Sequence, residues 1–240
     1  MSMHSGSVHT GDQLGRRTDR ARQIPEATAS RLLGYLRVLT EYSHARTASS
    51  RDLAAAAGVD AAKLRRDLSF LGSYGVRGVG YDVATLIDEI SRALGAHTAH
   101  RVALVGVGNL GHALAGYSGF PRHGFELVAL FDNDPQLIGT IAAGLRVHDI
   151  IDAATVIASE RASIGIIATP VDAAQQVADS LVDAGVRSIL NFAPCQLELG
   201  DDVNMRQVDL GLELQMLAFH EARRPPGLAG RVSSDRAVAR

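Results

Sequence analysis

The 240-residue sequence predicts an α/β fold in which a small helical domain precedes a larger domain built on a parallel sheet. Two observations support this. Three short amphipathic helical patterns follow one another in the first third of the chain. Beyond residue 100, apolar runs of strand length alternate with helical patterns, which is typical of a parallel sheet covered by helices on both faces.

The three patterns of the first third have clear helix ends. The first helix begins at Pro25, where the missing N–H costs little. Ser49 starts a capping box for a second, short helix that Gly58 ends, and a third helix runs from about Asp60 to Leu71. Because only a tight glycine turn separates the last two helices, we expect a helix-turn-helix.

The third predicted helix has two different faces. Leu64, Leu68 and Leu71 recur at positions i, i+4 and i+7, so they face the core. The opposite, polar side of the helix carries Lys63, Arg65, Arg66 and Ser69. The segment GSYGVRGVGY follows and predicts a glycine-cornered hairpin with Arg77 and Gly78 at its tip. Helices and hairpin together form the outline of a winged helix-turn-helix.

The basic residues predict a polyanionic partner for this domain. Residues 1–80 hold 12 Lys and Arg against 7 Asp and Glu, whereas residues 81–240 hold 12 against 19. Guanidinium groups on the third helix reach phosphates or guanine edges in a major groove, and Arg77 on a narrow hairpin suits a minor groove. We therefore expect double-stranded DNA as partner. Each basic residue taken singly is also compatible with a solvated surface charge.

The segment RVALVGVGNLGHAL contains a G-x-G-x-x-G pattern between an apolar strand and a helix. Its glycines suit a tight turn, close approach of the backbone to a pyrophosphate, and close helix–strand packing. The pattern and the residues within it are Gly106, Val107, Gly108, Asn109, Leu110 and Gly111. Asp132 ends the next strand, and a carboxylate there accepts ribose hydroxyls and repels a 2′-phosphate. We expect an NAD(H)-binding Rossmann domain; the alternative is a glycine turn without ligand or one that binds a different nucleotide.

Two later loops follow predicted strands, where ligands of open parallel sheets bind. Thr169 and Pro170 end one strand, and residues 191–194, NFAP, end another, so we expect both loops either beside the nicotinamide or as ordinary turns. The predicted domain limits are a tail at 1–22, a winged helix at 23–81, a linker helix at 82–99, a Rossmann domain at 100–208, a last helix at 209–222 and a tail at 223–240. We expect both tails to be disordered.

The stretches RRDLSFLGSYGVRGVGY, VGVGNLGHAL, FDNDP, NFAP and VDLGLELQ resemble the Rex family of redox-sensing transcriptional repressors, from about Ile24 to His220. The resemblance implies a homodimer that binds a palindromic operator when NAD⁺ prevails and releases it when NADH binds. It also implies a carboxyl-terminal helix exchanged between protomers. The family's coupling of cofactor to DNA falls on Arg37, Tyr117 and Asp209. They also have plainer interpretations: a surface residue, a helix-end aromatic beside the cofactor, and a helix cap.

Several function classes are disfavoured. No apolar run reaches the length of a membrane span, the amino terminus lacks the apolar core of a secretion signal, and Cys195 stands alone, so we expect a cytoplasmic protein. No catalytic residue and no metal site are predicted, because none of the nine histidines lies in a catalytic or metal-binding pattern. An NAD-dependent oxidoreductase and a Rossmann protein that binds coenzyme A are the alternatives.

Overall fold

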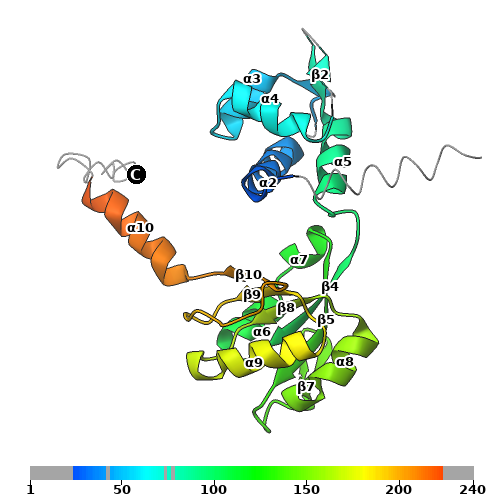
Figure 1. The fold of residues 1–240 in the computed structure, drawn as a ribbon, viewed down its shortest axis with the longest axis vertical. Helices are drawn as coiled ribbons and strands as arrows, with labels where there is room; N and C mark the ends of the chain where they lie inside the picture. Colours follow the sequence, from blue (N-terminus) through cyan, green and yellow to red (C-terminus); the bar gives the residue numbers. More distant parts are fainter. Residues whose placement is uncertain (1–23, 42–43, 73–74, 77–78, 224–240) are drawn as a thin grey trace, which may run out of the picture. The chain divides into compact units, whose positions relative to one another are not determined.

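The computed structural model describes residues 24–41, 44–72, 75–76 and 79–223. The chain divides into two compact units, and the division falls between Ala99 and His100 (Figure 1). The tail expected at 1–22 lies outside the described residues, and so does the tail expected at 223–240 apart from Arg223. No helix in the described ranges is long and apolar enough to cross a bilayer.

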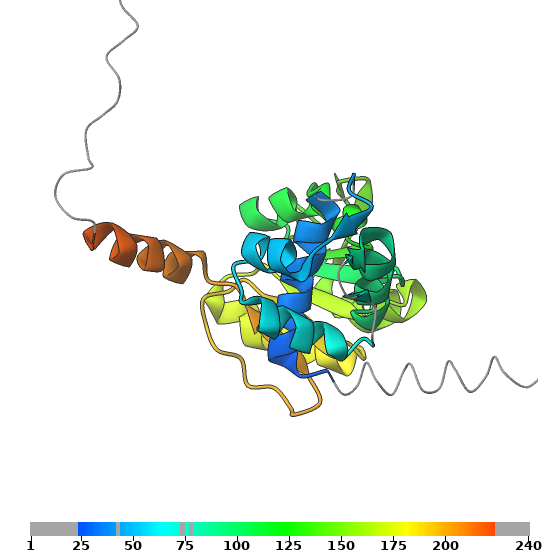
Figure 2. The ribbon, with the colours of Figure 1, turned by 90° about the horizontal axis from the view of Figure 1, so that it is seen from above.

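Within its described residues the first unit contains four helices and a small sheet. Figure 2 shows this unit from a second direction, in blue to green. Its helices are α2 (Glu26–Glu41), α3 (Ser50–Ala56), α4 (Ala61–Ser69) and α5 (Val83–Ala93). Its strands are β1 (Thr47–Ala48), β2 (Gly75–Val76) and β3 (Gly80–Asp82), in the antiparallel order β1-β3-β2. The predicted winged helix-turn-helix is confirmed.

Side-chain caps and a glycine determine where the two helices of the helix-turn-helix begin and end. The Ser49 hydroxyl accepts a hydrogen bond from the Asp52 N–H at 3.2 Å, as the capping box predicts. The Asp60 carboxylate accepts one from the Ala62 N–H at 2.8 Å and so begins α4. Gly58, between the helices, has φ +65°, a left-handed conformation that glycine adopts without strain.

The segment 82–99, expected as a linker helix, forms part of the core of the first unit. Val83, Leu86 and Ile90 of α5 are buried in the same cluster as Leu32 of α2 and Leu64 of α4. The Asp82 carboxylate caps this helix by accepting the N–H of residue 85. The amphipathic pattern of α5 is therefore that of a core helix, because its apolar face has the rest of the unit to pack against.

The second unit is built on one seven-stranded sheet in the order β10-β9-β8-β4-β5-β7-β6. The strands are β4 (His100–Val105), β5 (Phe125–Asp132), β6 (Ile141–Ala142), β7 (Leu145–Asp149), β8 (Ile164–Ile167), β9 (Ser188–Asn191) and β10 (Asn204–Gln207). All neighbours are parallel except β6 and β7. Taking the parallel strands in chain order gives 3-2-1-4-5-6, the order of the Rossmann fold, which confirms that prediction.

The two faces of this sheet are covered by different helices, as alternate residues of β4 show. Ala103 and Val105 pack in a cluster with α8 (Ala153–Glu160) and α9 (Val171–Asp183). Val102 and Leu104 pack in a second cluster with α6 (Asn109–Ala115) and α7 (Gly119–Arg122). Because both faces are buried, the central strands are almost continuously apolar, and this made them visible in the sequence.

The sequence did not predict α7, the strand β7 or the two edge strands β6 and β10. Strand β10, NMRQ, lies at the edge and is mostly exposed, so it has no apolar pattern. A short 3-10 helix, η1 (Ile150–Asp152), follows β7. The last helix, α10 (Leu210–Ala222), was predicted at 210–222, and none of its residues is buried.

Candidate nucleotide cleft and DNA-binding helix

A cleft of about 610 Å³ opens at the carboxyl ends of the central strands β4 and β8. Between these strands the chain order of the sheet reverses, which is where doubly wound sheets bind ligands. Five predicted cofactor residues line the cleft: Gly106, Gly108, Asp132, Thr169 and Pro170. The structure therefore brings the glycine turn, the acid after β5 and the loop after β8 to one site.

The three glycines of the turn differ in what a side chain at each position would meet. Gly106 has φ +93°, and a Cβ there would lie 2.7 Å from the Ala168 carbonyl oxygen. A Cβ on Gly111 would lie 1.7 Å from the Gly106 carbonyl oxygen, so this glycine allows α6 to pack against the turn. A Cβ on Gly108 would meet no atom within 4 Å. The first and third glycines are thus needed by the protein itself, whereas Gly108 leaves open space at the cleft.

Asp132 holds the turn by hydrogen bonds. One carboxylate oxygen accepts the Val107 N–H at 2.7 Å. The other accepts the N–H groups of Asn133 and Asp134 at 2.8 and 3.0 Å. The acid predicted to accept ribose hydroxyls also joins the end of β5 to the glycine turn after β4, and it retains acceptor capacity because each carboxylate oxygen has two lone pairs.

Thr169 supplies a polar atom that fits a ligand in this cleft. Its Oγ1 is buried and makes no hydrogen bond within the part of the chain that the structure describes. Buried polar groups are nearly always paired, so an unpaired hydroxyl on a cleft wall indicates a partner outside the chain. Open space at Gly108, the Thr169 hydroxyl and the Asp132 carboxylate together fit a dinucleotide with phosphate and sugar hydroxyl groups.

The remaining predicted cofactor residues are not among those that line the cleft. Val107 is buried, and Asn109 and Leu110 are exposed in the first turn of α6. Tyr117 is 55% exposed, and its ring packs edge-on against Phe120 with the ring centroids 5.2 Å apart. The loop at 191–194 is not among the lining residues either. In that loop the Asn191 side chain accepts the Ala193 N–H and donates to the Cys195 carbonyl, as in an ordinary structured turn.

Sequence reasoning missed several other residues that line the cleft: Leu137, Asp149, Ile150, Ile151, Gln176 and Ser180. Ile151 is 85% exposed. For Asp149, Ile150 and Ile151 the signal in the sequence was weak, because they end or follow β7, a strand whose five residues include an arginine, a histidine and an aspartate.

The predicted DNA-binding residues of α4 share its exposed side. Lys63, Arg65, Arg66 and Ser69 are all exposed, whereas Leu64 and Leu68 between them are buried. Arg77 and Gly78, expected at the tip of the hairpin, lie outside the described residues. The described part of the hairpin, β2 and β3, forms a shallow pocket with Arg65 and the start of α3. In that pocket Arg65 donates a 3.1 Å hydrogen bond to the Ser50 hydroxyl.

The three predicted signalling residues have distinct local settings. Arg37 is an exposed residue of α2. Tyr117 comes directly after Gly116, the residue that caps the end of α6. The Asp209 carboxylate accepts the N–H groups of Gly211 and Leu212 at 2.8 and 3.2 Å, so Asp209 caps α10. The interpretation of Asp209 as a helix cap is confirmed, and a signalling role for the three residues stays a prediction.

Within the described residues, no group of three or more His, Cys, Asp or Glu side chains is arranged to hold a metal ion.

Two family models match the chain. A model described as "CoA binding domain" matches residues 97–195, and one described as "Putative DNA-binding protein N-terminus" matches residues 23–69. The two matches fall on the second and first units, respectively.

A helix-turn-helix unit joined to a Rossmann unit with a nucleotide-sized cleft defines a ligand-responsive transcription regulator. The chain is 55% identical over 224 residues to the redox-sensing transcriptional repressor Rex of Streptomyces griseus, covering 92% of this chain and 86% of that protein. It is 44% identical over 200 residues to the Rex repressor of Desulfitobacterium hafniense, covering 82% and 95%. The chain therefore belongs to the Rex family of redox-sensing transcriptional repressors, as the sequence motifs predicted.

Solved structures agree with this assignment. The structure of RSP in complex with β-NAD⁺ and operator DNA matches with a TM-score of 0.79 and 36% identity, over 82% of this chain and 92% of that one. The structure of RSP in complex with β-NADH matches with a TM-score of 0.75 and 34% identity, over 82% and 94%. The relatives are repressors, which confirms the prediction of a regulator rather than an NAD-dependent oxidoreductase.

Proposed function

We propose that this chain binds operator DNA through α4 and the β2–β3 hairpin, binds NAD(H) in the cleft of its second unit, and releases DNA when NADH binds. The observation that carries the proposal is the convergence of the glycine turn, Asp132 and the unpaired Thr169 hydroxyl on one cleft, in a chain of the Rex family. RSP, a structural relative, was crystallised with NADH and, separately, with NAD⁺ and operator DNA.

Each cleft residue has a separate part in holding the coenzyme. The backbone at Gly108 leaves room for a pyrophosphate, and Asp132 accepts ribose hydroxyls and disfavours a 2′-phosphate. Thr169 and Pro170 form the wall after β8, and the Thr169 hydroxyl gains the partner that it lacks within the protein. When bound, NADH or NAD⁺ supplies a nicotinamide whose charge and shape depend on its redox state. The chain itself needs no chemical step for this, only a difference in affinity.

Coenzyme A is the second candidate ligand, because a family model with that description matches residues 97–195. Asp132 favours NAD(H): its carboxylate lies at the carboxyl end of β5, where it would repel the 3′-phosphate that coenzyme A carries on its ribose as it repels a 2′-phosphate. Titration of the protein with NADH and with coenzyme A distinguishes the two. Tight binding of coenzyme A without competition by NADH would contradict the proposal.

The proposed assembly is a homodimer in which α10 packs against the partner. Six large apolar side chains of α10 are more than half exposed in the single chain: Leu210, Leu212, Leu214, Met216, Leu217 and Phe219. At about 100° per residue they fall on two opposite sides of the helix, and a helix with apolar side chains on opposite sides is normally buried. Leu214→Asp with Leu217→Asp should reduce the mass in solution to that of a monomer, measured by light scattering; an unchanged mass would contradict this role.

Dimerisation gives the switch its geometry. A two-fold dimer reads two half-sites with its recognition helices about 34–36 Å apart, so a modest change in the angle between protomers spoils the fit to both half-sites. In this proposal the angle between protomers differs between the NAD⁺-bound and the NADH-bound protein. Arg37, Tyr117 and Asp209 rearrange when one state changes to the other. As a repressor of chromosomal operators, the protein acts in the cytoplasm.

A gel-shift experiment on fragments of the source genome tests the proposed function. It is run with NADH, with NAD⁺ and with neither. A fragment retarded with NAD⁺ and freed by NADH is the expected result. If no fragment is retarded under any condition, the proposed function is wrong.

A further inference from the structure

Asp67 is a charged residue on the core face of α4, the helix that we propose to read the DNA. It lies between Leu64 and Leu71 in sequence, and only 2% of its surface is exposed. An ionised carboxylate is costly to bury unless it is paired and hydrogen-bonded. Leu64 and Leu68 already give α4 an apolar face toward the core. The carboxylate therefore requires an explanation beyond packing.

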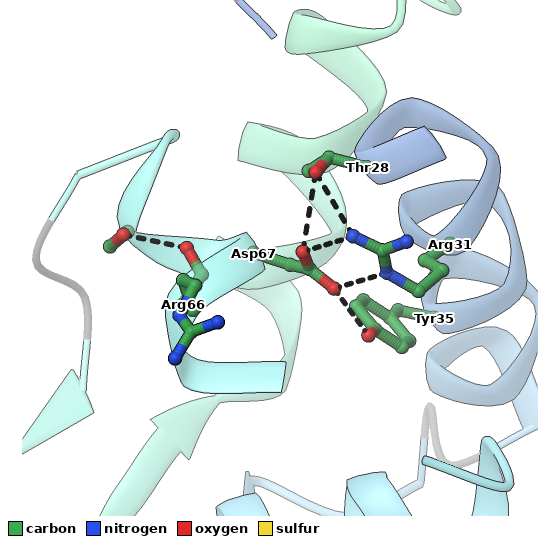
Figure 3. A network of polar contacts seen from close by, with 6 residues as sticks. Thr28, Arg31, Tyr35, Arg66 and Asp67 are labelled. Carbon is green, nitrogen blue, oxygen red and sulfur yellow. Dashed lines mark hydrogen bonds and ion pairs between the residues drawn. The ribbon is translucent and has the colours of Figure 1, made fainter. Parts of the chain in front are cut away.

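All partners of this carboxylate come from α2 (Figure 3). Arg31 donates to both carboxylate oxygens, from Nε at 2.7 Å and from Nη2 at 2.6 Å. The Tyr35 hydroxyl donates at 2.8 Å and the Thr28 hydroxyl at 3.3 Å. Arg31 also donates to the Thr28 oxygen at 3.1 Å, so the four residues form one connected network. The Arg31 guanidinium lowers the pKa of Asp67, which keeps the carboxylate ionised.

This network determines how α4 is rotated about its own axis. Apolar contacts are not directional, so a helix of nine residues resting on two leucines tolerates small rotations. A two-pronged guanidinium–carboxylate pair is directional, because both N–H groups must point at their oxygens. Arg66 is the neighbour of Asp67 in sequence, and Figure 3 shows its side chain on the other side of α4 from the Arg31 fork. Fixing Asp67 thus fixes the direction of Arg66.

We infer that Asp67 is a positioning residue for sequence recognition: through Arg31, Tyr35 and Thr28 it holds α4 at the rotation that presents Arg65 and Arg66 to base edges. The inference rests on the proposed DNA binding and adds to it a source of specificity inside the protein. Hydrogen bonds to bases depend on angle, whereas attraction to phosphates depends mainly on charge. Loosening the anchor should therefore weaken binding to the preferred site and leave binding to other DNA almost unchanged.

The test uses the full chain and a DNA probe chosen by the protein itself. The wild-type protein first enriches a preferred duplex from a random-sequence pool; that duplex and a scrambled duplex of equal length are then titrated at one salt concentration with NAD⁺ present. For Asp67→Asn we expect at least about a tenfold loss of affinity for the preferred duplex and less than about a twofold change for the scrambled one. Affinity for NADH should not change.

A second variant separates positioning from stability. Arg31→Met with Asp67→Leu replaces the buried ion pair by apolar side chains, a change that often preserves or raises stability. We expect this variant to unfold at or above the temperature of Asp67→Asn while the preference for the selected duplex stays lost. Asp88→Asn is the matched control, because it breaks an ion pair with Arg92 that is exposed and lies on α5. The control should retain full preference.

Three results would overturn the inference. Equal loss on both duplexes in Asp67→Asn would mean that the network only keeps the unit folded. Recovery of the preference in the apolar double variant would mean that directionality is not needed. If the wild-type protein enriches no duplex at all, the proposed DNA binding itself is wrong. A wild-type preference that Asp67→Asn retains would reject the inference alone.

Discussion

The Asp132 carboxylate accepts a 2.7 Å hydrogen bond from the backbone N–H of Val107, and so the end of β5 is joined to the glycine turn after β4. The residue that we propose to select the coenzyme by charge therefore also holds the glycine turn. Two further N–H groups, from residues 133 and 134, hold its other oxygen. Coenzyme selectivity and the geometry of the turn cannot vary independently at this position.

Replacing Asp132 by asparagine should affect both properties. The amide removes the negative charge that opposes a 2′-phosphate, and it has less acceptor capacity toward the three N–H groups. We expect the preference for NADH over NADPH to fall by about tenfold and the free energy of unfolding to fall by roughly 1–3 kcal/mol. Calorimetric titration with both coenzymes and thermal unfolding measure the two effects.

Asp134→Asn is the matched control for this prediction. Asp134 also lines the cleft, but its carboxylate accepts only the N–H of Gln136 in its own turn. The preference for NADH should persist in this variant. An equal relaxation in both variants would assign selectivity to the general negative charge of the cleft and count against Asp132.

The pair Gly108 and Gly111 separates a ligand requirement from a folding requirement. Gly111→Ala places a methyl group against the Gly106 carbonyl, so we expect it to destabilise the second unit by more than about 1–3 kcal/mol, the usual cost of overpacking. Gly108→Ala meets open space and should keep the wild-type melting temperature. It should nevertheless weaken NADH binding about tenfold or more, because the methyl group occupies the approach of the pyrophosphate. Normal NADH affinity in Gly108→Ala would place the pyrophosphate elsewhere.

Arg66→Ala tests the exposed side of α4. Without the Arg66 guanidinium, operator binding should be weaker, and its dependence on log salt concentration should be less steep by about 0.9 for each phosphate that the protein no longer neutralises. NADH affinity should be unchanged, because Arg66 belongs to the first unit. Arg92→Gln, on α5, is the control and should leave the salt slope as it is, since Asp88 and Glu89 already neutralise Arg92. Loss of NADH binding in Arg66→Ala would indicate misfolding.

The Asp67 network predicts an acid dependence of stability. Arg31 lowers the native pKa of Asp67 below its value of 3.8 in the unfolded chain. The contribution of the ionised Asp67 carboxylate to the free energy of unfolding is therefore fully present above about pH 5, and it is lost as the pH falls through the lowered native pKa. The pKa of Tyr35 is raised to about 12, mainly by burial, so its hydroxyl remains a donor throughout. The melting temperatures of wild type and Asp67→Asn, measured from pH 6 down to pH 2, should converge; a constant difference would contradict the network's ionisation.

Strong periodicity made most of the fold predictable. Leu64, Leu68 and Leu71 defined α4, and the glycines around Gly108 marked the first strand-to-helix turn of the sheet. Strand β10 was missed because an edge strand need not be apolar: it is paired on one side only, through backbone groups that any sequence provides. Strand β7 is paired on both sides, but its five residues include an arginine, a histidine and an aspartate, so it has no apolar run.

Only part of the cleft lining was predicted. Asp132 and Thr169 follow recognisable strands, but Ile150 and Ile151 follow β7, and their part in the cleft depends on tertiary structure alone. Tyr117 packs its ring on Phe120 and is not among the residues that line the cleft, so its contact with the coenzyme stays a prediction. The sequence analysis did not single out Asp67, because its partners in α2 are more than 30 residues away and pattern reasoning does not reach them.

The central claim is that NADH and operator DNA bind the same protein with a shared coupling free energy. For such a two-state switch, the factor by which NADH weakens operator binding must equal the factor by which the operator weakens NADH binding. Titrating the dimer with operator at zero and saturating NADH, and with NADH at zero and saturating operator, measures both factors. We predict two equal factors, each well above one. Operator affinity that does not change with saturating NADH would contradict the account.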